Sequence, residues 1–310
     1  MQAAPFEPEP GKPHPLAPGL QLVLAPNPSP MTERGTNTYL LGTDALVVID
    51  PGPADSVHLQ ALLRTIAGRP VRYILLTHSH RDHSGLAPDL ARETGAPVAA
   101  FGPSAAGQSD VMAALAASGH LGGGEGIDPA FTPDITLQDE QLLRVDDWAL
   151  RALHTPGHMG NHMCFVWNHA VFTGDHVMGW SSSIISPPDG DLTDFMASCH
   201  KLQDIAARVY YPGHGAPIHK PMDRLAWLIA HRQTRSAEVT AALVHGPKTP
   251  ATLAQTIYAD LPTKMLPIAE RNVLAHLIDL VRRDIVAARG GISAHAEFGL
   301  LDVENTQTRK

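Results

Sequence analysis

Residues 77–85, THSHRDHSG, place four side chains that can bind a metal ion within six positions. They directly follow an apolar run, which predicts a buried strand. Side chains two residues apart on a strand point to the same side, so His78 and His80 would project together from its end. Asp82 and His83 follow where the chain turns into a helix, so they can face a second ion nearby. The stretch therefore predicts metal binding at the end of a strand.

The composition is that of an ordinary globular protein. The chain has 310 residues, a mass of 33.2 kDa and 44% hydrophobic residues, enough to bury a large core. A net charge of -8 gives no general attraction to polyanions. Two distant cysteines predict buried thiols in a reducing compartment. The sequence shows neither a secretory signal nor a membrane-length apolar run, so we expect a cytoplasmic enzyme.

The apolar pattern divides the chain into three parts. Residues 1–18 are rich in proline and lack periodicity, which predicts a flexible arm. Residues 19–222 alternate short apolar strands with turns and helices, which predicts an α/β catalytic domain. The strands are expected at residues 20–25, 38–41, 45–49, 71–76, 98–101, 142–145, 148–152, 163–167, 170–173 and 209–211.

The third part, residues 223–310, has a different pattern. It contains three predicted helices and then a hairpin around Gly290 and Gly291, an arrangement typical of a winged helix. Acidic residues offset Arg282 and Arg283. This balance favours a lid or packing subdomain over one that recognises nucleic acid.

Three later segments each end a predicted strand with a ligand-type residue beside glycine. They are HTPGH at 154–158, FTGD at 172–175 and YPGHG at 211–215. Each segment alone is weak evidence, because a histidine or aspartate beside glycine usually marks a turn. Together with THSHRDHSG they complete a two-metal site.

In the order HxHxDH, His, Asp, His, the sequence resembles the metallo-β-lactamase superfamily over residues 20–222. The resemblance implies a four-layer αββα sandwich with the site at one edge of its two sheets. It also implies two metal ions per chain, with zinc expected and manganese or iron as alternatives. One ion would be held by His78, His80 and His158, the other by Asp82, His83 and His214, with Asp175 bridging both.

The resemblance also assigns roles in catalysis. Paired metal ions lower the pKa of a bridging water, so that hydroxide is present near neutral pH to attack the substrate. Asp82 would bind metal and orient that hydroxide, and Asp175 would hold both ions. Asp50, in VVIDPGP at 47–53, matches the superfamily's supporting aspartate and would hydrogen-bond a ligand. Its alternative interpretation is an ordinary turn aspartate before Pro51.

Differences between subfamilies exclude several branches of the superfamily. Class B β-lactamases lack a bridging carboxylate at the position of Asp175, and flavodiiron proteins usually carry glutamate at the position of His80. The interposed domain of β-CASP nucleases and the flexible arm of ribonuclease Z are not visible. The remaining group surrounds glyoxalase II, and within it the sequence resembles the β-lactamase-like protein 2 branch. That likeness rests on RGTNTYLLG at 34–42, HTPGHMGNHM at 154–163, FTGDHVMGWSSS at 172–183 and YPGHGAPIHKP at 211–221.

Five further residues are candidates for contacts around the metals: His162, Trp180, Ser181, Ser182 and His219. His162 would contact substrate or a ligand, or serve as a buried structural histidine. His219 would reach the rim of the centre or lie on an exposed loop. Trp180, Ser181 and Ser182 would contact substrate, with a hydrophobic cover as the alternative for Trp180.

Two functions from different classes follow from these patterns. A hydrolase of a small ester, thioester or lactone would attack a carbonyl in a compact pocket under residues 179–190. A single-stranded RNA endonuclease of the β-lactamase-like protein 2 type would attack phosphorus, and it needs a basic track that the charge pattern does not show. A metal-binding protein without turnover is disfavoured because the ligand set is complete. The sequence leaves the substrate and the oligomeric state open.

Overall fold

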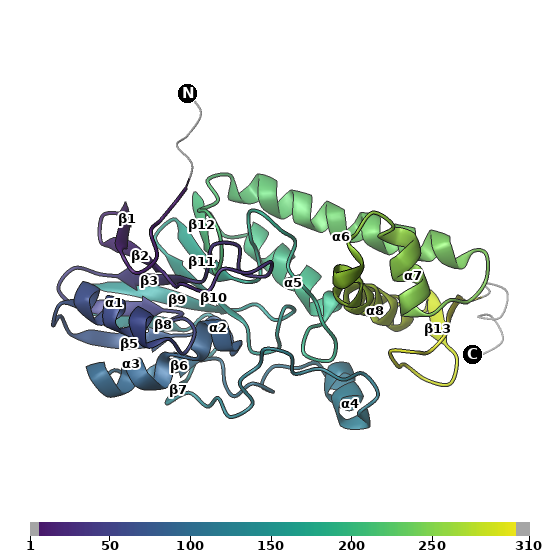
Figure 1. Ribbon diagram of the computed structural model, residues 1–310, viewed down its shortest axis with the longest axis horizontal. Helices are drawn as coiled ribbons and strands as arrows, with labels where there is room; N and C mark the ends of the chain where they lie inside the picture. Colours follow the sequence, from purple (N-terminus) through teal and green to yellow (C-terminus); the bar gives the residue numbers. More distant parts are fainter. Residues whose placement is uncertain (1–5, 302–310) are drawn as a thin grey trace.

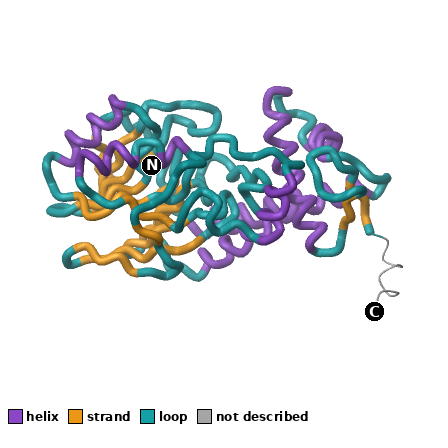
Figure 2. The backbone as a smooth tube through the Cα atoms, turned by 90° about the horizontal axis from the view of Figure 1, so that it is seen from below, coloured by secondary structure: helices purple, strands orange, loops and turns teal. Residues whose placement is uncertain are grey.

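Two sheets packed face to face form the larger part of the protein, whose computed structural model describes residues 6–301 (Figures 1 and 2). The first sheet has seven strands in the order of the chain. They are β1 (Pro13–Ala17), β2 (Leu20–Leu24), β3 (Asn37–Leu41), β4 (Leu46–Ile49), β5 (Val71–Leu75), β6 (Val98–Ala100) and β7 (Ile135–Thr136).

The second sheet has five strands in the order β12-β11-β10-β9-β8. They are β8 (Leu142–Val145), β9 (Trp148–His154), β10 (Met163–Trp167), β11 (Ala170–Gly174) and β12 (Val209–Pro212). The main core lies between the two sheets, because alternate residues of each strand point to the same face. On β2, Leu20, Leu22 and Leu24 point inward and meet Phe165 and Phe172 of the second sheet.

Helices cover the outer face of each sheet, which confirms the predicted four-layer αββα sandwich. α1 (Ser56–Ile66) and α3 (Ala87–Thr94) pack on the first sheet, and α5 (Leu192–Gln203) and α6 (Pro221–Leu243) pack on the second. The helices α2 (Arg81–Ser84) and α4 (Asp110–Ser118) lie in the connections. Within the described part of the chain, none of the helices combines the length and the apolar character that crossing a membrane requires.

The C-terminal elements form a separate cluster at one end of the sandwich (Figure 1). After α6 come α7 (Pro250–Ile257), a short 3-10 helix (Thr263–Met265) and α8 (Leu266–Arg282), followed by the hairpin strands β13 (Val286–Ala288) and β14 (Phe298–Leu300). Thr249 caps α7, because its side chain accepts a hydrogen bond from the backbone N–H of Thr252. The predicted winged-helix pattern is therefore present, and the predicted boundary after residue 222 falls in the first turn of α6.

The N-terminal segment differs from the prediction of a flexible arm over residues 1–18. Residues 13–17 form β1, which pairs with β2 at the edge of the first sheet, so the prediction is wrong for this stretch. Pro13 and Pro15 lack a backbone N–H, but an edge strand pairs on one side only and tolerates them. Residues 1–5 lie outside the described part of the chain.

Three arginines of the C-terminal helices bind the loop that follows β11. Arg224 donates from Nε to the carbonyl of Met178 (2.7 Å) and from a terminal nitrogen to that of Ser181 (2.6 Å). Arg232, only 3% exposed, donates to the carbonyl of Ser183, and Arg271 donates to that of Pro187 (3.2 Å). Hydrogen bonds from charged donors are stronger than neutral ones, so these contacts fix the loop on the C-terminal helices.

We expect Arg232→Met to lower the free energy of unfolding by about 2 kcal/mol, because the buried Ser183 carbonyl loses a charged donor while the apolar stem is retained. Urea unfolding measures this change. Arg64→Met on α1, where the side chain is exposed, is the control and should stay within about 0.5 kcal/mol of the wild type. An equally small change for Arg232→Met would contradict the structural role of this contact.

Candidate metal centre

The seven predicted ligand residues converge at one edge of the sandwich. Each follows the end of a strand: β5 precedes the THSHRDHSG stretch, β9 precedes His158, β11 precedes Asp175 and β12 precedes His214. Their ligand atoms form three overlapping groups, each within 4.8 Å: His78, His80 and His158; His78, His83 and Asp175; and Asp82, His83 and His214.

Three imidazoles make up the first side of the cluster. His78 Nε2 lies 2.9 Å from His80 Nδ1, and His158 Nε2 lies 3.1 Å from the same atom. Asp175 Oδ2 approaches this side at 3.8 Å from His158 Nε2. Three nitrogens and one carboxylate oxygen thus point at a common centre.

The second side combines two imidazoles with carboxylates. His83 Nε2 lies 3.3 Å from His214 Nε2, and Asp82 Oδ2 lies 3.3 Å from His214 Nε2. Asp175 Oδ1 is 3.5 Å from His83 Nε2 and 3.4 Å from His214 Nε2. The two oxygens of Asp175 therefore face opposite sides of the cluster.

This donor set fits divalent cations. Two nitrogens bound to one tetrahedral Zn²⁺ at ~2.0–2.1 Å would lie ~3.3 Å apart, which is close to the spacings between these imidazoles. Asp175 Oδ1 is buried and accepts no hydrogen bond from any described residue. A buried carboxylate oxygen without a donor is costly, and a bound cation would satisfy it.

Glycines beside the ligands allow the strand ends to approach so closely. A Cβ atom on Gly213 would lie 2.5 Å from Asp175 Oδ1 and 2.6 Å from a ring carbon of His83. A Cβ atom on Gly174 would lie 2.6 Å from the Thr77 hydroxyl, and its φ of +47° also favours glycine. These contacts explain why the FTGD and YPGHG motifs place glycine next to a ligand-type residue.

Asp50, which the resemblance gave as a supporting aspartate, follows β4 and lies behind the cluster. Its Oδ1 accepts the Thr77 N–H (2.8 Å), and its Oδ2 accepts the Thr77 hydroxyl (2.7 Å) and lies 2.9 Å from His83 Nδ1. His83 therefore donates through Nδ1, which leaves Nε2 to face the cluster. Because the Thr77 hydroxyl donates its hydrogen bond to Asp50, it accepts one from His78 Nδ1 (3.0 Å). Thr77 thus fixes the tautomer of His78.

Backbone carbonyls orient two further histidines. His158 Nδ1 donates to the carbonyl of Ile184 (2.8 Å), and His214 Nδ1 donates to that of Gly35 (3.1 Å). Both rings therefore present Nε2 to the cluster. Sequence reasoning identified neither these carbonyls nor Thr77, although Thr77 opens the quoted stretch.

We expect Thr77→Val to weaken metal affinity by about 10–100-fold, since loss of a hydrogen bond that orients a ligand has effects of this size. The isosteric change removes both the donor to Asp50 and the acceptor for His78. Competition with a chromophoric chelator measures the affinity. Thr94→Val on α3, whose hydroxyl bonds to the carbonyl of Leu90, is the control. Unchanged affinity in Thr77→Val would contradict the orienting role.

Burial dominates the electrostatics of the first side. It lowers the pKa of His80 to about 3 and also lowers those of His78 and His158. These three imidazoles are therefore neutral near pH 7 and carry free lone pairs.

On the second side of the cluster, the charges of the carboxylates determine the pKa values of the histidines. Burial opposes protonation of His214, but the charges of Asp175 and Asp82 outweigh it and raise the pKa to about 9. For Asp82, burial favours the neutral acid, yet His83 and His214 hold its pKa at about 2. Without metal, protons on these histidines balance the carboxylate charge.

Metal affinity should therefore rise with pH. A cation that binds His214 must displace its proton below about pH 9, so the apparent affinity gains about tenfold per pH unit for each displaced proton and levels off above that pH. Chelator competition between pH 6 and pH 10 measures this slope. An affinity that is constant from pH 6 to pH 9 would contradict the assignment of protonated histidines to the second side.

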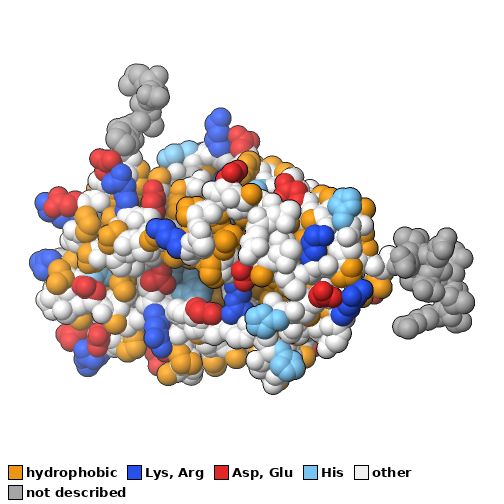
Figure 3. Space-filling view, turned by 45° about the vertical axis from the view of Figure 1, so that its right-hand side comes forward, with side chains coloured by type: hydrophobic (Ala, Val, Ile, Leu, Met, Phe, Trp, Pro, Cys, Tyr) orange, Lys and Arg blue, Asp and Glu red, His pale blue; other side chains and the backbone are white. Residues whose placement is uncertain are grey.

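A cavity of about 820 Å³ opens above the cluster. His80, Asp82, His158, Asp175 and His214 contribute to its floor. Figure 3 shows this face, with histidine side chains at the bottom of a hollow and hydrophobic side chains beside it. Three of the predicted substrate contacts also line the cavity, namely Trp180, Ser181 and Ser182.

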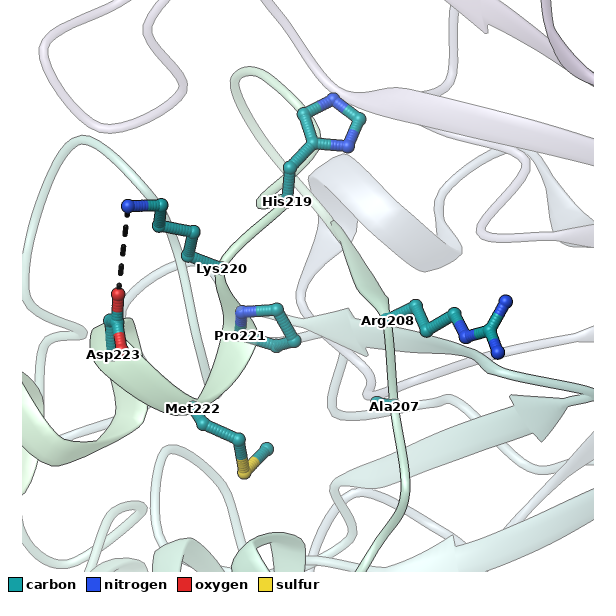
Figure 4. A pocket seen from close by; sticks show the side chains of 7 residues that line it. All are labelled: Ala207, Arg208, His219, Lys220, Pro221, Met222 and Asp223. Atoms are coloured by element: carbon teal, nitrogen blue, oxygen red, sulfur yellow. Dashed lines mark ion pairs between the residues drawn. The ribbon is translucent and has the colours of Figure 1, made fainter.

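The other two candidates lie elsewhere. His162 is buried behind the ligands, with its ring centre 5.3 Å from that of His78 and its Nδ1 3.0 Å from the Thr155 hydroxyl. It does not line the cavity. His219 is exposed and lines a separate surface hollow with Arg208 and Met222, among others (Figure 4). The structure therefore places it away from the rim, because the chain after His214 folds back and Ile218 pairs with Tyr210 of β12.

The comparison with known proteins assigns the chain to a family. Residues 31–214 match the Metallo-beta-lactamase superfamily, and residues 249–295 match the Beta-lactamase associated winged helix domain. The first match covers more than half of the chain, so the protein belongs to the metallo-beta-lactamase superfamily of hydrolases.

Particular relatives cover most of the chain. The chain is 31% identical over 288 residues to the atrochrysone carboxyl ACP thioesterase of Aspergillus fumigatus, covering 86% of this chain and 81% of the relative. It is 30% identical over 291 residues to the beta-lactamase-like protein 2 homolog of Drosophila melanogaster, covering 89% and 91%. A metallo-beta-lactamase family protein from Thermus thermophilus has a similar solved structure, with a TM-score of 0.72 at 28% identity, covering 92% of this chain and 99% of that one.

Proposed function

We propose that the protein is a dinuclear, zinc-dependent hydrolase of a carboxylic ester, thioester or lactone. The observation that carries this proposal is the cavity above the ligand cluster, whose walls are largely apolar. Side chains such as Met178, Ile184 and Ile268 line it. Such a pocket suits a small organic substrate held by a few polar groups at its floor. The similarity to a fungal thioesterase supports a carbonyl substrate.

Each side of the cluster would hold one metal ion. His78, His80 and His158 would bind the first, Asp82, His83 and His214 the second, and Asp175 both. Bound zinc lowers the pKa of water and polarises the carbonyl oxygen of a substrate. Neutral imidazoles on the first side and carboxylates on the second supply the nitrogen and oxygen donors that zinc prefers, while manganese and iron accept similar ligands.

Asp82 is the carboxylate best placed to act on the reacting groups. Its side chain is 31% exposed and reaches the cavity, whereas that of Asp175 is 11% exposed and lies between the histidines. Asp82 would accept a hydrogen bond from the attacking water and direct it at the carbonyl. Thr77 and Asp50 would keep the imidazoles in place while this happens, since neither residue lines the cavity.

The alternative, cleavage of single-stranded RNA, has less support. Helix α8 is mostly buried, so most of its side chains are not available to contact a strand of RNA. Nearby cations are paired: Arg271 with Glu125 and Arg282 with Asp191. Tight binding of a phosphate backbone needs several free cations, and the charged lining of the cavity does not provide them.

We expect Asp82→Asn to lower kcat/KM for ester or thioester hydrolysis by about 10²–10⁴-fold, because the neutral amide binds a metal ion more weakly than a carboxylate and accepts a weaker hydrogen bond from the attacking water. His158→Ala should lower both metal content and turnover, and His219→Ala, on an exposed histidine outside the cavity, is the matched control. The measurements are elemental analysis and a panel of thioesters, esters and lactones beside a fluorophore-quenched single-stranded RNA. Metal-dependent RNA cleavage that disappears in Asp82→Asn, with no carbonyl hydrolysis, would overturn the proposal in favour of the alternative.

A further inference from the structure

The cavity is bounded by two apolar walls that come from distant parts of the chain. One wall belongs to the C-terminal subdomain, where the connection between α7 and α8 and the start of α8 contribute Leu261, Met265 and Ile268. A second set of apolar lining residues consists of Met31 and, from the loop after β11, Trp180. The C-terminal subdomain thus completes the cavity in addition to packing on the sandwich.

Two of these apolar side chains are unusually exposed. Met31 is 42% exposed and Trp180 is 40% exposed, although both lie beside a cavity. Exposed apolar side chains that line the same hollow indicate a surface that a ligand covers. The volume of about 820 Å³ is near the upper end of the range for small-molecule pockets, so it exceeds what an acetyl-sized group can fill.

Polar side chains on the same walls are already engaged by the protein. Arg271 pairs with Glu125, and the Asn272 side-chain oxygen accepts hydrogen bonds from the Ile185 N–H and from Arg232. The Asp189 carboxylate accepts from the N–H of Gly124 (2.7 Å). These groups therefore offer little to a ligand, and the walls contribute mainly hydrophobic contacts.

The polar end of the cavity lies next to the ligand cluster. Arg81 lines the cavity beside Asp82, is exposed, and forms no ion pair with any described residue. A polar or anionic leaving group would be accommodated there. The apolar walls are then left for the other half of the substrate.

We propose that the substrate carries a large apolar acyl group, which binds between Met31 and Trp180 on one side and Leu261, Met265 and Ile268 on the other. This inference rests on the proposed ester or thioester hydrolysis and names its substrate class. The C-terminal subdomain then determines substrate specificity, because its residues select which acyl chains reach the metal centre.

An acyl-chain series on the zinc-loaded full-length protein tests the proposal. With N-acetylcysteamine thioesters from acetyl to dodecanoyl, kcat/KM should rise about three- to fourfold for each added methylene until the walls are covered. A second series keeps the acyl group and lengthens an apolar thiol. If kcat/KM follows the thiol and is independent of the acyl group, the proposal is overturned.

Variants locate the effect on the two walls. Met31→Ala and Ile268→Ala should lower kcat/KM for decanoyl thioester about tenfold more than for acetyl thioester. Met222→Ala is the matched control for Met31, because Met222 is 38% exposed and lies outside the cavity. Leu300→Ala on β14 is the control in the C-terminal subdomain. Equal effects on both substrates, or equal effects in the controls, would contradict the wall assignment.

Calorimetric binding of the free carboxylic acids separates this inference from the proposed function. Affinity that rises from acetate to decanoate and falls in Ile268→Ala supports the apolar walls even if no ester is hydrolysed, and in that case only the proposed function fails. Hydrolysis with no dependence on chain length overturns only the inference. Absence of both chain-length-dependent binding and hydrolysis overturns both.

Discussion

The Asp50 carboxylate lies at the end of β4 and is almost completely buried. It accepts hydrogen bonds from the backbone N–H and the hydroxyl of Thr77 and from His83. This carboxylate joins the ends of two parallel strands, and it determines which nitrogen of His83 and, through Thr77, of His78 faces the cluster. Once these two rings are set, the glycine turns after β11 and β12 can bring Asp175 and His214 against them. The whole centre therefore depends on one buried charge that is fully hydrogen-bonded.

Much of this arrangement was predictable because its signals are local. Short apolar runs located β8 and β10 at their observed bounds, and four ligand-type side chains in one short stretch indicated a candidate metal centre. The supporting role of Asp50 followed from the resemblance and from its place after a strand. By contrast, β7 has only two residues, Ile135 and Thr136, and is too short to produce a periodic pattern.

The walls of the cavity and the place of His219 were not predictable in the same way. Met31 and Ile268 are separated by most of the chain, and no local pattern relates them. Both line one cavity. Arginines of α6 and α8 join its C-terminal side to the loop after β11 through backbone carbonyls, which any residue would supply. Because a backbone carbonyl does not depend on residue type, contacts of this kind cannot be identified from the sequence, whereas a metal ligand requires a particular side chain.

The two outer strands of the first sheet have one more consequence. An unpaired strand edge presents free N–H and C=O groups to which a strand of another molecule can add, and this is a common route to aggregation. Here one edge is β1, in which Pro13 and Pro15 remove N–H donors, and the other is β7, which is too short to act as a template. The proline-rich beginning of the chain thus protects a seven-stranded sheet from self-association.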